Sequence, residues 1–325
     1  MKKILKFVGI SVTSVLGICV LYGVYFLFTY PAVSKAESLS IEATPERLAR
    51  GKYLANHVTV CIDCHSQRNW DYFSGPIIPG TEGEGGFHFG RDYGLPGEIY
   101  AKNITPAGIG KMTDGELFRT ITSGVRKNGE VLFPTMPYPE FNKLSDEDLY
   151  SIIAYIRTLK PIEHAVPETK LDFPYNFTVR EIPARHVSVG EPDTSDLYAY
   201  GQYLANAADC IDCHTMQVYG ERVKGMEFAG GREFPVAEGT VRSMNLTPDV
   251  GTGIGTWNEQ TFVGLFKRYA TADTVALQDY ARVHNTIMPW VMFSGMTDHD
   301  LLAIYKFLRT LQPINHQVVL FTPAH

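Results

Sequence analysis

Cys61-Ile62-Asp63-Cys64-His65 recurs later in the chain as Cys210-Ile211-Asp212-Cys213-His214. Cys-x-x-Cys-His is the attachment pattern of haem c, in which two thiols one helical turn apart bond the haem vinyl groups and the adjacent histidine faces the iron. The repeated stretch therefore predicts two covalently bound haem c groups. Their expected attachment residues are Cys61, Cys64, Cys210 and Cys213, and the expected iron ligands are His65 and His214.

The Cys-x-x-Cys spacing also occurs in zinc sites and in thiol-redox sites, which are the alternative interpretation. A zinc site needs a second pair of thiols or imidazoles at ligand spacing, and a thioredoxin-like motif follows a strand in a βαβ unit. Neither context accompanies the two stretches, so haem attachment is favoured. The fifth cysteine, Cys19, is left alone, and no disulfide framework is expected.

Composition bounds the size and the partners of the protein. The chain has 325 residues, of which 45% are hydrophobic, and this is enough for two domains and an anchor. Its net charge is −6 and the sequence contains no block of lysine and arginine. A nucleic-acid partner is therefore not expected.

The N-terminus has the pattern of a membrane anchor. Lys2, Lys3 and Lys6 precede an uncharged run that continues to Tyr30. That run exceeds the roughly 20 residues of a membrane-spanning helix and the ~7–15 residues of a signal-peptide core. We expect a single-pass anchor in the inner (cytoplasmic) membrane, with the remaining chain in the periplasm or otherwise outside the cytoplasm. Cleavage after Ala36 is the alternative.

The sequence around the two haem motifs is also repeated. Gly51-Lys-Tyr-Leu-Ala-Asn56 corresponds to Gly201-Gln-Tyr-Leu-Ala-Asn206, and Asn103-Ile-Thr-Pro106 corresponds to Asn245-Leu-Thr-Pro248. These landmarks occur in the same order in both halves, as duplication of one domain predicts. The expected divisions are an anchor (1–30), a tether (31–43), a first domain (44–162), an interdomain linker (163–196), a second domain (197–316) and a tail (317–325).

Each half is expected to begin and end with a helix. Thr44-Pro45 has the composition of a helix start, with a capping hydroxyl followed by proline. Ser145-x-x-Asp148 and Thr297-x-x-Asp300 begin the two final amphipathic helices. The expected fold class is all-α. The linker is too apolar for a flexible spacer, and we expect it to fix the orientation of the two domains.

The sixth iron ligand decides whether a haem is closed for electron transfer or open to small ligands. Met136 and Met288 occupy matching places, each on a proline-bounded loop before the final helix. His/Met coordination is therefore predicted in both halves. Methionine is more often a core residue, which is the structural alternative. The competing ligands are His88 in the first half and His284, Met292 and Met296 in the second.

These motifs together resemble the class I cytochrome c domains of the membrane-bound cytochrome subunits of periplasmic alcohol, aldehyde and gluconate dehydrogenases. The resemblance rests on Arg50-Gly-x-Tyr-Leu before Cys-x-x-Cys-His, on Asn-Ile-Thr-Pro followed by Gly-Ile-Gly, and on Met136-Pro-Tyr. It covers both halves and implies an N-terminal transmembrane helix followed by two tandem class I cytochrome c domains. Those subunits usually carry three such domains, and Met112 here stands in the place of Trp257.

The resemblance implies a membrane-tethered dihaem electron carrier without substrate chemistry of its own. Its expected partners are redox proteins, namely a periplasmic dehydrogenase, a quinol-oxidising complex or a terminal oxidase. A dihaem cytochrome c peroxidase-like enzyme is an alternative, but it requires an exchangeable sixth position at one haem. A haem relay subunit fixed within a respiratory complex is a further alternative.

Overall fold

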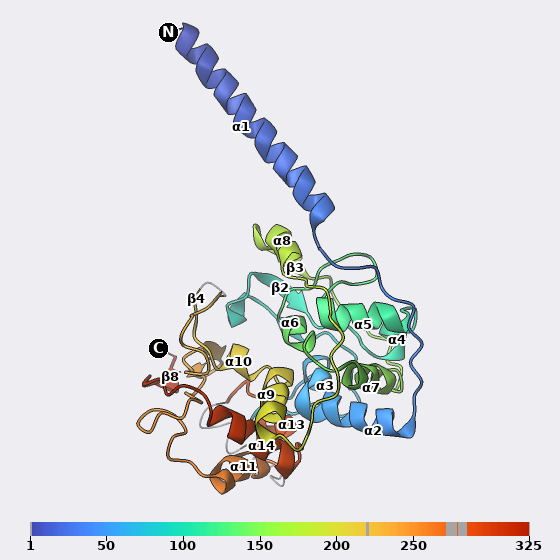
Figure 1. Cartoon of the computed structure of the whole chain (residues 1–325), viewed down its shortest axis with the longest axis vertical. Helices are drawn as coiled ribbons and strands as arrows, with labels where there is room; N and C mark the ends of the chain where they lie inside the picture. The colour runs from blue at the N-terminus through green and yellow to red at the C-terminus, as the bar shows by residue number, and fades with distance from the viewer. Residues whose placement is uncertain (1, 219–220, 271–277, 279–284, 325) are drawn as a thin grey trace.

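A long helix, α1 (Lys2–Thr29), extends away from the folded remainder of the chain (Figure 1). The computed structural model describes residues 2–218, 221–270, 278 and 285–324. The stretch Lys6–Thr29 has a mean hydropathy of 2.1, and within the described ranges it is the one helix long and apolar enough to span a membrane. This agrees with the uncharged run seen in the sequence.

Two crossed helix pairs form the framework of the folded part. In the first half α2 (Pro45–Tyr53) packs on α7 (Asp146–Ile156), and in the second α9 (Leu197–Ala207) packs on α14 (Asp298–Leu308). A Cβ atom at Gly51 would lie 1.8 Å from the carbonyl oxygen of Ser151, and one at Gly201 would lie 1.9 Å from that of Ala303. Glycine is therefore required at both crossings because the backbones touch.

The helices begin where the capping residues predict. The side chain of Thr44 accepts from the N–H of Arg47, and that of Ser145 accepts from the N–H of Asp148. Thr297 caps α14 in the same way.

The short helical segments are α3 (Cys61–Cys64), α4 (Pro106–Ile109), α5 (Asp114–Ser123), α6 (Tyr138–Phe141), α8 (Tyr175–Thr178), α10 (Cys210–Cys213), α11 (Glu259–Lys267), α13 (Trp290–Phe293), a π-helical turn (Leu54–Val58) and 3₁₀ turns (Arg91–Tyr93, Val179–Glu181).

The prediction of an all-α fold is wrong, because the described residues also form three small antiparallel sheets. The first sheet has the order β1-β2-β3, the second is the pair β4-β5, and the third has the order β6-β7-β8. Their strands are β1 (His88–Phe89), β2 (Gly97–Tyr100), β3 (Lys170–Leu171), β4 (Gln217–Val218), β5 (Glu221–Arg222), β6 (Glu233–Val236), β7 (Gly239–Arg242) and β8 (Phe321–Pro323).

The strands escaped prediction because each has only two to four residues, too few to show alternation. In two of the sheets, one strand also comes from a segment that is distant in the sequence. Lys170 of the linker pairs with Glu98, and Phe321 of the tail pairs with Val241. The linker and the tail therefore complete sheets that begin in the irregular middle of each half.

One cluster of buried apolar side chains includes residues of both halves, among them Leu54 and Leu149 of the first and Leu204 and Leu301 of the second. The linker packs on the first half, where Asp146 N–H donates to the carbonyl of Val189. Direct contacts between the halves, rather than the linker alone, therefore hold their relative orientation.

Candidate haem sites

Both Cys-x-x-Cys stretches form one helical turn, α3 and α10, and the same backbone feature precedes each turn. Val60 has φ 44° and Asp209 has φ 51°, so both are in the left-handed region. This conformation is unfavourable for a residue with a side chain, above all for a β-branched valine. Strain of this kind is characteristic of functional sites, and its recurrence directly before both first cysteines fits a shared role.

The predicted histidine ligands have equivalent surroundings. His65 Nδ1 lies 2.6 Å from the carbonyl oxygen of Lys102, and His214 Nδ1 lies 2.8 Å from that of Met244. A carbonyl oxygen only accepts, so Nδ1 carries the proton in both rings and Nε2 retains its lone pair. Burial lowers the pKa of both histidines, which favours the neutral form. A metal-binding imidazole has this state and this type of second hydrogen bond.

The two predicted attachment sites lie near each other. Burial raises the pKa of Cys64 to about 12, and the charge of Asp209, which precedes the other motif, contributes to this rise. Burial likewise raises the pKa of Cys213 to about 12, with a contribution from Cys64. Electrostatic effects of Asp209 on Cys64 and of Cys64 on Cys213 act over short distances only. The second cysteine of the first motif therefore lies near the second motif.

The two methionine loops have the same backbone conformation. The N–H of Tyr138 donates to the carbonyl of Met136 at 2.7 Å, and that of Trp290 donates to the carbonyl of Met288 at 2.8 Å. The intervening prolines have φ and ψ values of −78° and 51° in the first half and −80° and 60° in the second. Both methionines are half-buried and pack against the core cluster. Met136 and Met288 are thus structurally equivalent.

The competing ligands differ from this pair. Met296 is 1% exposed and is part of the core cluster, and Met292 is 9% exposed within α13. His88 Nε2 lies 2.5 Å from Glu98 Oε2, and its ring stacks on Tyr100. His284 lies outside the described residues. Where side chains are described, no three His, Cys, Asp or Glu residues gather as a metal-ion site, so the zinc interpretation gains no additional ligand there.

Two buried hydroxyl groups beside the Met136 loop indicate what could bind there. Thr135 Oγ1 and Tyr138 Oη, on either side of Met136, are buried and have no hydrogen-bond partner in the described part of the protein. Buried hydroxyls of this kind need a partner. A group with acceptor atoms bound beside this loop would satisfy them, so the residues present fit the predicted haem.

The Met288 loop is held by the first half, a feature that the sequence did not reveal. Ser74 Oγ donates to the carbonyl of Met288 at 2.7 Å, and Ser74 N–H donates to Asn285 Oδ1 at 2.8 Å. The amide of Asn285 donates to the carbonyls of Trp70 and Tyr72. We call Ser74 and Asn285 the loop clamp. Its members lie more than two hundred residues apart, so no local pattern could have identified it.

The aspartate of each motif is paired with an arginine. Asp63 lies 3.1 Å from Arg68, and both side chains are less than a tenth exposed. Asp212 pairs with Arg232 in the second half. Burial raises the pKa of Asp63, and Arg68 opposes this effect. The arginines therefore neutralise carboxylates that are part of the attachment turns.

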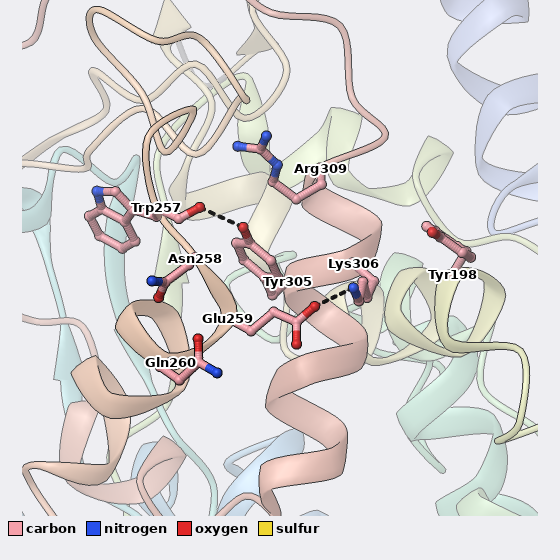
Figure 2. A pocket seen from close by; sticks show the side chains of 8 residues that line it. All are labelled: Tyr198, Trp257, Asn258, Glu259, Gln260, Tyr305, Lys306 and Arg309. Atoms are coloured by element: carbon pink, nitrogen blue, oxygen red, sulfur yellow. Dashed lines mark hydrogen bonds and ion pairs between the residues drawn. The ribbon is translucent and has the colours of Figure 1, made fainter.

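A surface hollow between α11 and α14 is separate from these motifs (Figure 2). Figure 2 shows Lys306 directed at Glu259 and the hydroxyl of Tyr305 bonded to the carbonyl of Trp257. Four of the lining residues are thus bonded in pairs, and the hollow contains none of the cysteine, histidine and methionine residues that the sequence predicts as haem ligands.

Comparisons with known proteins agree with the resemblance drawn from the motifs. The chain is 27% identical over 307 residues to the cytochrome c subunit of the quinone alcohol dehydrogenase of Gluconobacter oxydans. It is 29% identical over 279 residues to the fructose dehydrogenase cytochrome subunit of Gluconobacter japonicus. The chain resembles dehydrogenase cytochrome c subunits. The resemblance drawn from the motifs is therefore confirmed, although no protein-family model matches the chain.

The extent of these similarities differs between relatives. The alcohol and fructose dehydrogenase subunits match 87% and 81% of this chain, yet the chain spans only 58% and 52% of their lengths. A diheme c-type cytochrome of Cereibacter sphaeroides is 26% identical over 271 residues, which cover 78% of this chain and 82% of that protein. These relatives support an electron-transferring haem protein.

Proposed function

We propose that this chain is a membrane-tethered dihaem c-type cytochrome that relays electrons from a dehydrogenase or quinol-oxidising complex to an acceptor such as a terminal oxidase. The proposal places α1 in the inner membrane and both haem domains on its periplasmic side. The observation that carries it is the equivalence of the two sites. Each combines a Cys-x-x-Cys turn, a histidine with a free Nε2 and a methionine on a matching loop.

The residues of each proposed site have distinct roles. Cys61 and Cys64 would hold the first haem and Cys210 and Cys213 the second, while His65 and Met136 would bind the first iron and His214 and Met288 the second. Haem c supplies one-electron redox chemistry when bound, and a thioether ligand stabilises its reduced form. Lys102 and Met244 orient the imidazoles through their carbonyls. The proximity of the two motifs supports transfer between the sites within one chain.

The number of haems is tested by mass and by haem-stained denaturing electrophoresis of the exported protein. The proposal expects colour retained on the chain and a mass increase of two haem groups. Cys64→Ala and Cys213→Ala are matched variants, and each should weaken attachment in one half only. A chain that carries one haem, or none, would contradict the proposal.

The coordination is tested by Met136→Ala and Met288→Ala. Loss of a soft thioether should lower the reduction potential of one haem and open it to carbon monoxide. Each variant should lose about half of the far-red sulfur-to-iron absorption and gain one carbon-monoxide-binding site. Met292→Ala serves as the control and should change neither signal. Ready binding of carbon monoxide by the unmutated protein would favour the peroxidase-like alternative.

The membrane orientation has its own test. A reporter that is active only outside the cytoplasm, fused after His325, should be active in cells that attach haem c. The lysines before the span favour a cytoplasmic N-terminus, which places the C-terminus outside. Activity of a cytoplasm-specific reporter at the same position would overturn the proposed side of the membrane.

A further inference from the structure

The linker residues 173–182, here called the 173–182 segment, pack against the end of α1. Phe177 of α8 stacks on Phe26 of α1 with 4.1 Å between ring centroids, and Phe26 is only 1% exposed. The guanidinium of Arg180 donates twice to the carbonyl oxygen of Tyr30, at 2.5 and 3.1 Å. Figure 1 shows α8 beside the lower end of α1, on the side of the folded part that faces this helix.

The depth of this contact follows from helix geometry. At about 1.5 Å per residue, Phe26 lies about 28 Å along the axis from Phe7, where the uncharged run begins. The hydrocarbon core of a bilayer is about 30 Å thick. If α1 spans the membrane, Phe26 lies at the far boundary of the hydrocarbon. Phe177 is stacked on Phe26 and must lie at nearly the same depth.

The 173–182 segment exposes two aromatic side chains and one aliphatic side chain, beside the polar Asn176, Thr178 and Glu181. Phe173 is 83% exposed, Ile182 is 41% exposed and Tyr175 is 37% exposed. Aromatic side chains concentrate at membrane–water interfaces, where the ring lies among headgroups. Short surface elements with exposed aromatic and aliphatic residues bind there by burying this apolar area. The exposed face is thus at the correct depth and has the correct composition for phospholipid.

We propose that the 173–182 segment is a second membrane contact, inserted into the headgroup region of the leaflet at the C-terminal end of α1. Phe173, Tyr175 and Ile182 would contact phospholipid, while Phe177 and Arg180 connect the segment to α1. The proposal rests on the proposed function only in taking α1 as a membrane span. Its occupant is the bilayer itself, because the stack of Phe177 on Phe26 holds the segment at the membrane boundary.

A second contact restricts how the haem domains move. A helix joined only through the polar tether would let the folded part rotate and tilt freely. The 173–182 segment adds a fixed point on the first half, and β3 and α8 lie closer to α1 than α11 and α14 do (Figure 1). Both haem domains would then be restrained in their rotation and tilt relative to the membrane.

The test uses the full-length haem-loaded protein in phosphatidylcholine vesicles that contain a phospholipid with a photoreactive diazirine on its acyl chain near the headgroup. After irradiation, lipid adducts are mapped by peptide mass spectrometry. Adducts are expected in α1 and in the 173–182 segment. The peptide that contains Val250, which is 72% exposed in the second half, is the control and should carry at least about tenfold fewer adducts.

The pattern of adducts separates the possible failures. Adducts in α1 but not in the 173–182 segment would overturn the second contact and leave the exposed aromatics to a protein partner. Their absence from α1 would refute the membrane span in the proposed function. Adducts at both places would support both proposals.

A matched pair of variants examines the aromatic face itself. The double variant Phe173→Ser, Tyr175→Ser should lose most adducts in the 173–182 segment, while those in α1 remain. Val187→Ser removes another apolar side chain, 73% exposed in the same linker, and should leave the pattern unchanged. Equal loss in both variants would show that general disturbance of the linker, not lipid contact by the aromatic face, determines labelling, and would overturn the proposal.

Discussion

At the scale of single residues, the loop clamp distinguishes the two proposed haem sites. Ser74 is 1% exposed and has φ 65°, a conformation that serine rarely adopts. The strained backbone directs its hydroxyl to the carbonyl of Met288. The Met136 loop instead carries the unpartnered hydroxyls of Thr135 and Tyr138. Equivalent methionines are therefore held by different means, and we expect the two haems to have different reduction potentials.

Ser74→Ala should affect the second site more than the first. The lost hydrogen bond stabilises the Met288 loop by about 0.5–1.5 kcal/mol. Its removal should lower the reduction potential of the second haem by roughly tens of millivolts. A redox titration that resolves both haems provides the measurement. Ser188→Ala removes a hydroxyl that binds Asp146 on the surface and should change neither potential. An equal shift at both haems would contradict specific support of Met288.

Asp146 links the linker to α7 in a pH-dependent manner. Burial opposes its ionisation, yet hydrogen bonds from Ser188, His186 and Val189 outweigh this effect and lower its pKa. Since the unfolded value is about 3.9, the stabilisation is fully present above that pH and is lost as the pH falls through the lower folded pKa. Pepsin cleavage within residues 183–196 should therefore accelerate in that window, after correction for the pH profile of pepsin.

Asp146→Asn is the control for this pH effect. The amide cannot ionise, so pepsin should cleave the linker of this variant faster than that of the unmutated protein even above about pH 4. The cleavage rate of the variant should also change less on acidification. The same pH profile in both proteins would show that another group controls release of the linker.

At the scale of helices, the glycine crossings determine the framework. Gly51→Ala would place a Cβ 1.8 Å from the carbonyl oxygen of Ser151, a contact that neither backbone can relieve without moving. We expect a loss of about 3 kcal/mol or more in unfolding free energy, at the upper end of overpacking costs. Urea denaturation followed by far-UV circular dichroism measures this change.

Gly264→Ala is the matched control for the crossing. Gly264 lies within α11, and nothing lies within 4 Å of the position of an added Cβ. Alanine is favoured over glycine in helices, so this variant should be stabilised by up to about 1 kcal/mol. Similar destabilisation of both variants would indicate that close helix contact is not the reason for glycine at position 51.

Local sequence signals predicted the helices but not the strands. Thr44, Ser145 and Thr297 identify the starts of α2, α7 and α14 because a cap acts within three residues. The attachment motifs and the methionine loops were visible because they recur. The hairpins β4–β5 and β6–β7 were missed because their strands are too short to show alternation, and β3 and β8 were missed because they pair with the distant β2 and β7. Pairing over such separations leaves no periodic trace in a short strand.

At the scale of the whole molecule, reciprocal hydrogen bonds join the halves. Tyr53 Oη donates to Asp300 Oδ2 at 2.6 Å, and the equivalent Tyr203 Oη donates to Asp148 Oδ2 at 2.6 Å. Each tyrosine oxygen also accepts the N–H of the N-cap residue on the opposite half. These contacts join positions far apart in sequence, which explains why sequence analysis assigned the orientation of the halves to the linker.

The two tyrosines should contribute unequally to stability. Tyr53→Phe leaves Asp300, which is 5% exposed, without its strongest hydrogen bond. Tyr203→Phe leaves Asp148 with a two-pronged bond from Arg50, at 2.7 and 2.8 Å. Tyr53→Phe should therefore cost about 1–3 kcal/mol and Tyr203→Phe less, because Asp300 keeps only weaker contacts with His299 and Tyr200 whereas Asp148 keeps its ion pair. Urea unfolding measures both, and the reverse order would contradict this account.

The reciprocal bonds also bear on the ancestry of the chain. Two identical subunits around a two-fold axis form an isologous interface, in which residue i of one contacts residue j of the other and j contacts i. Tyr53 with Asp300 and Tyr203 with Asp148 satisfy this rule once the halves are treated as copies. Each half thus carries both the donor and the acceptor. A single-domain precursor would already have had the contact needed to dimerise, and gene fusion would have preserved that dimer within one chain.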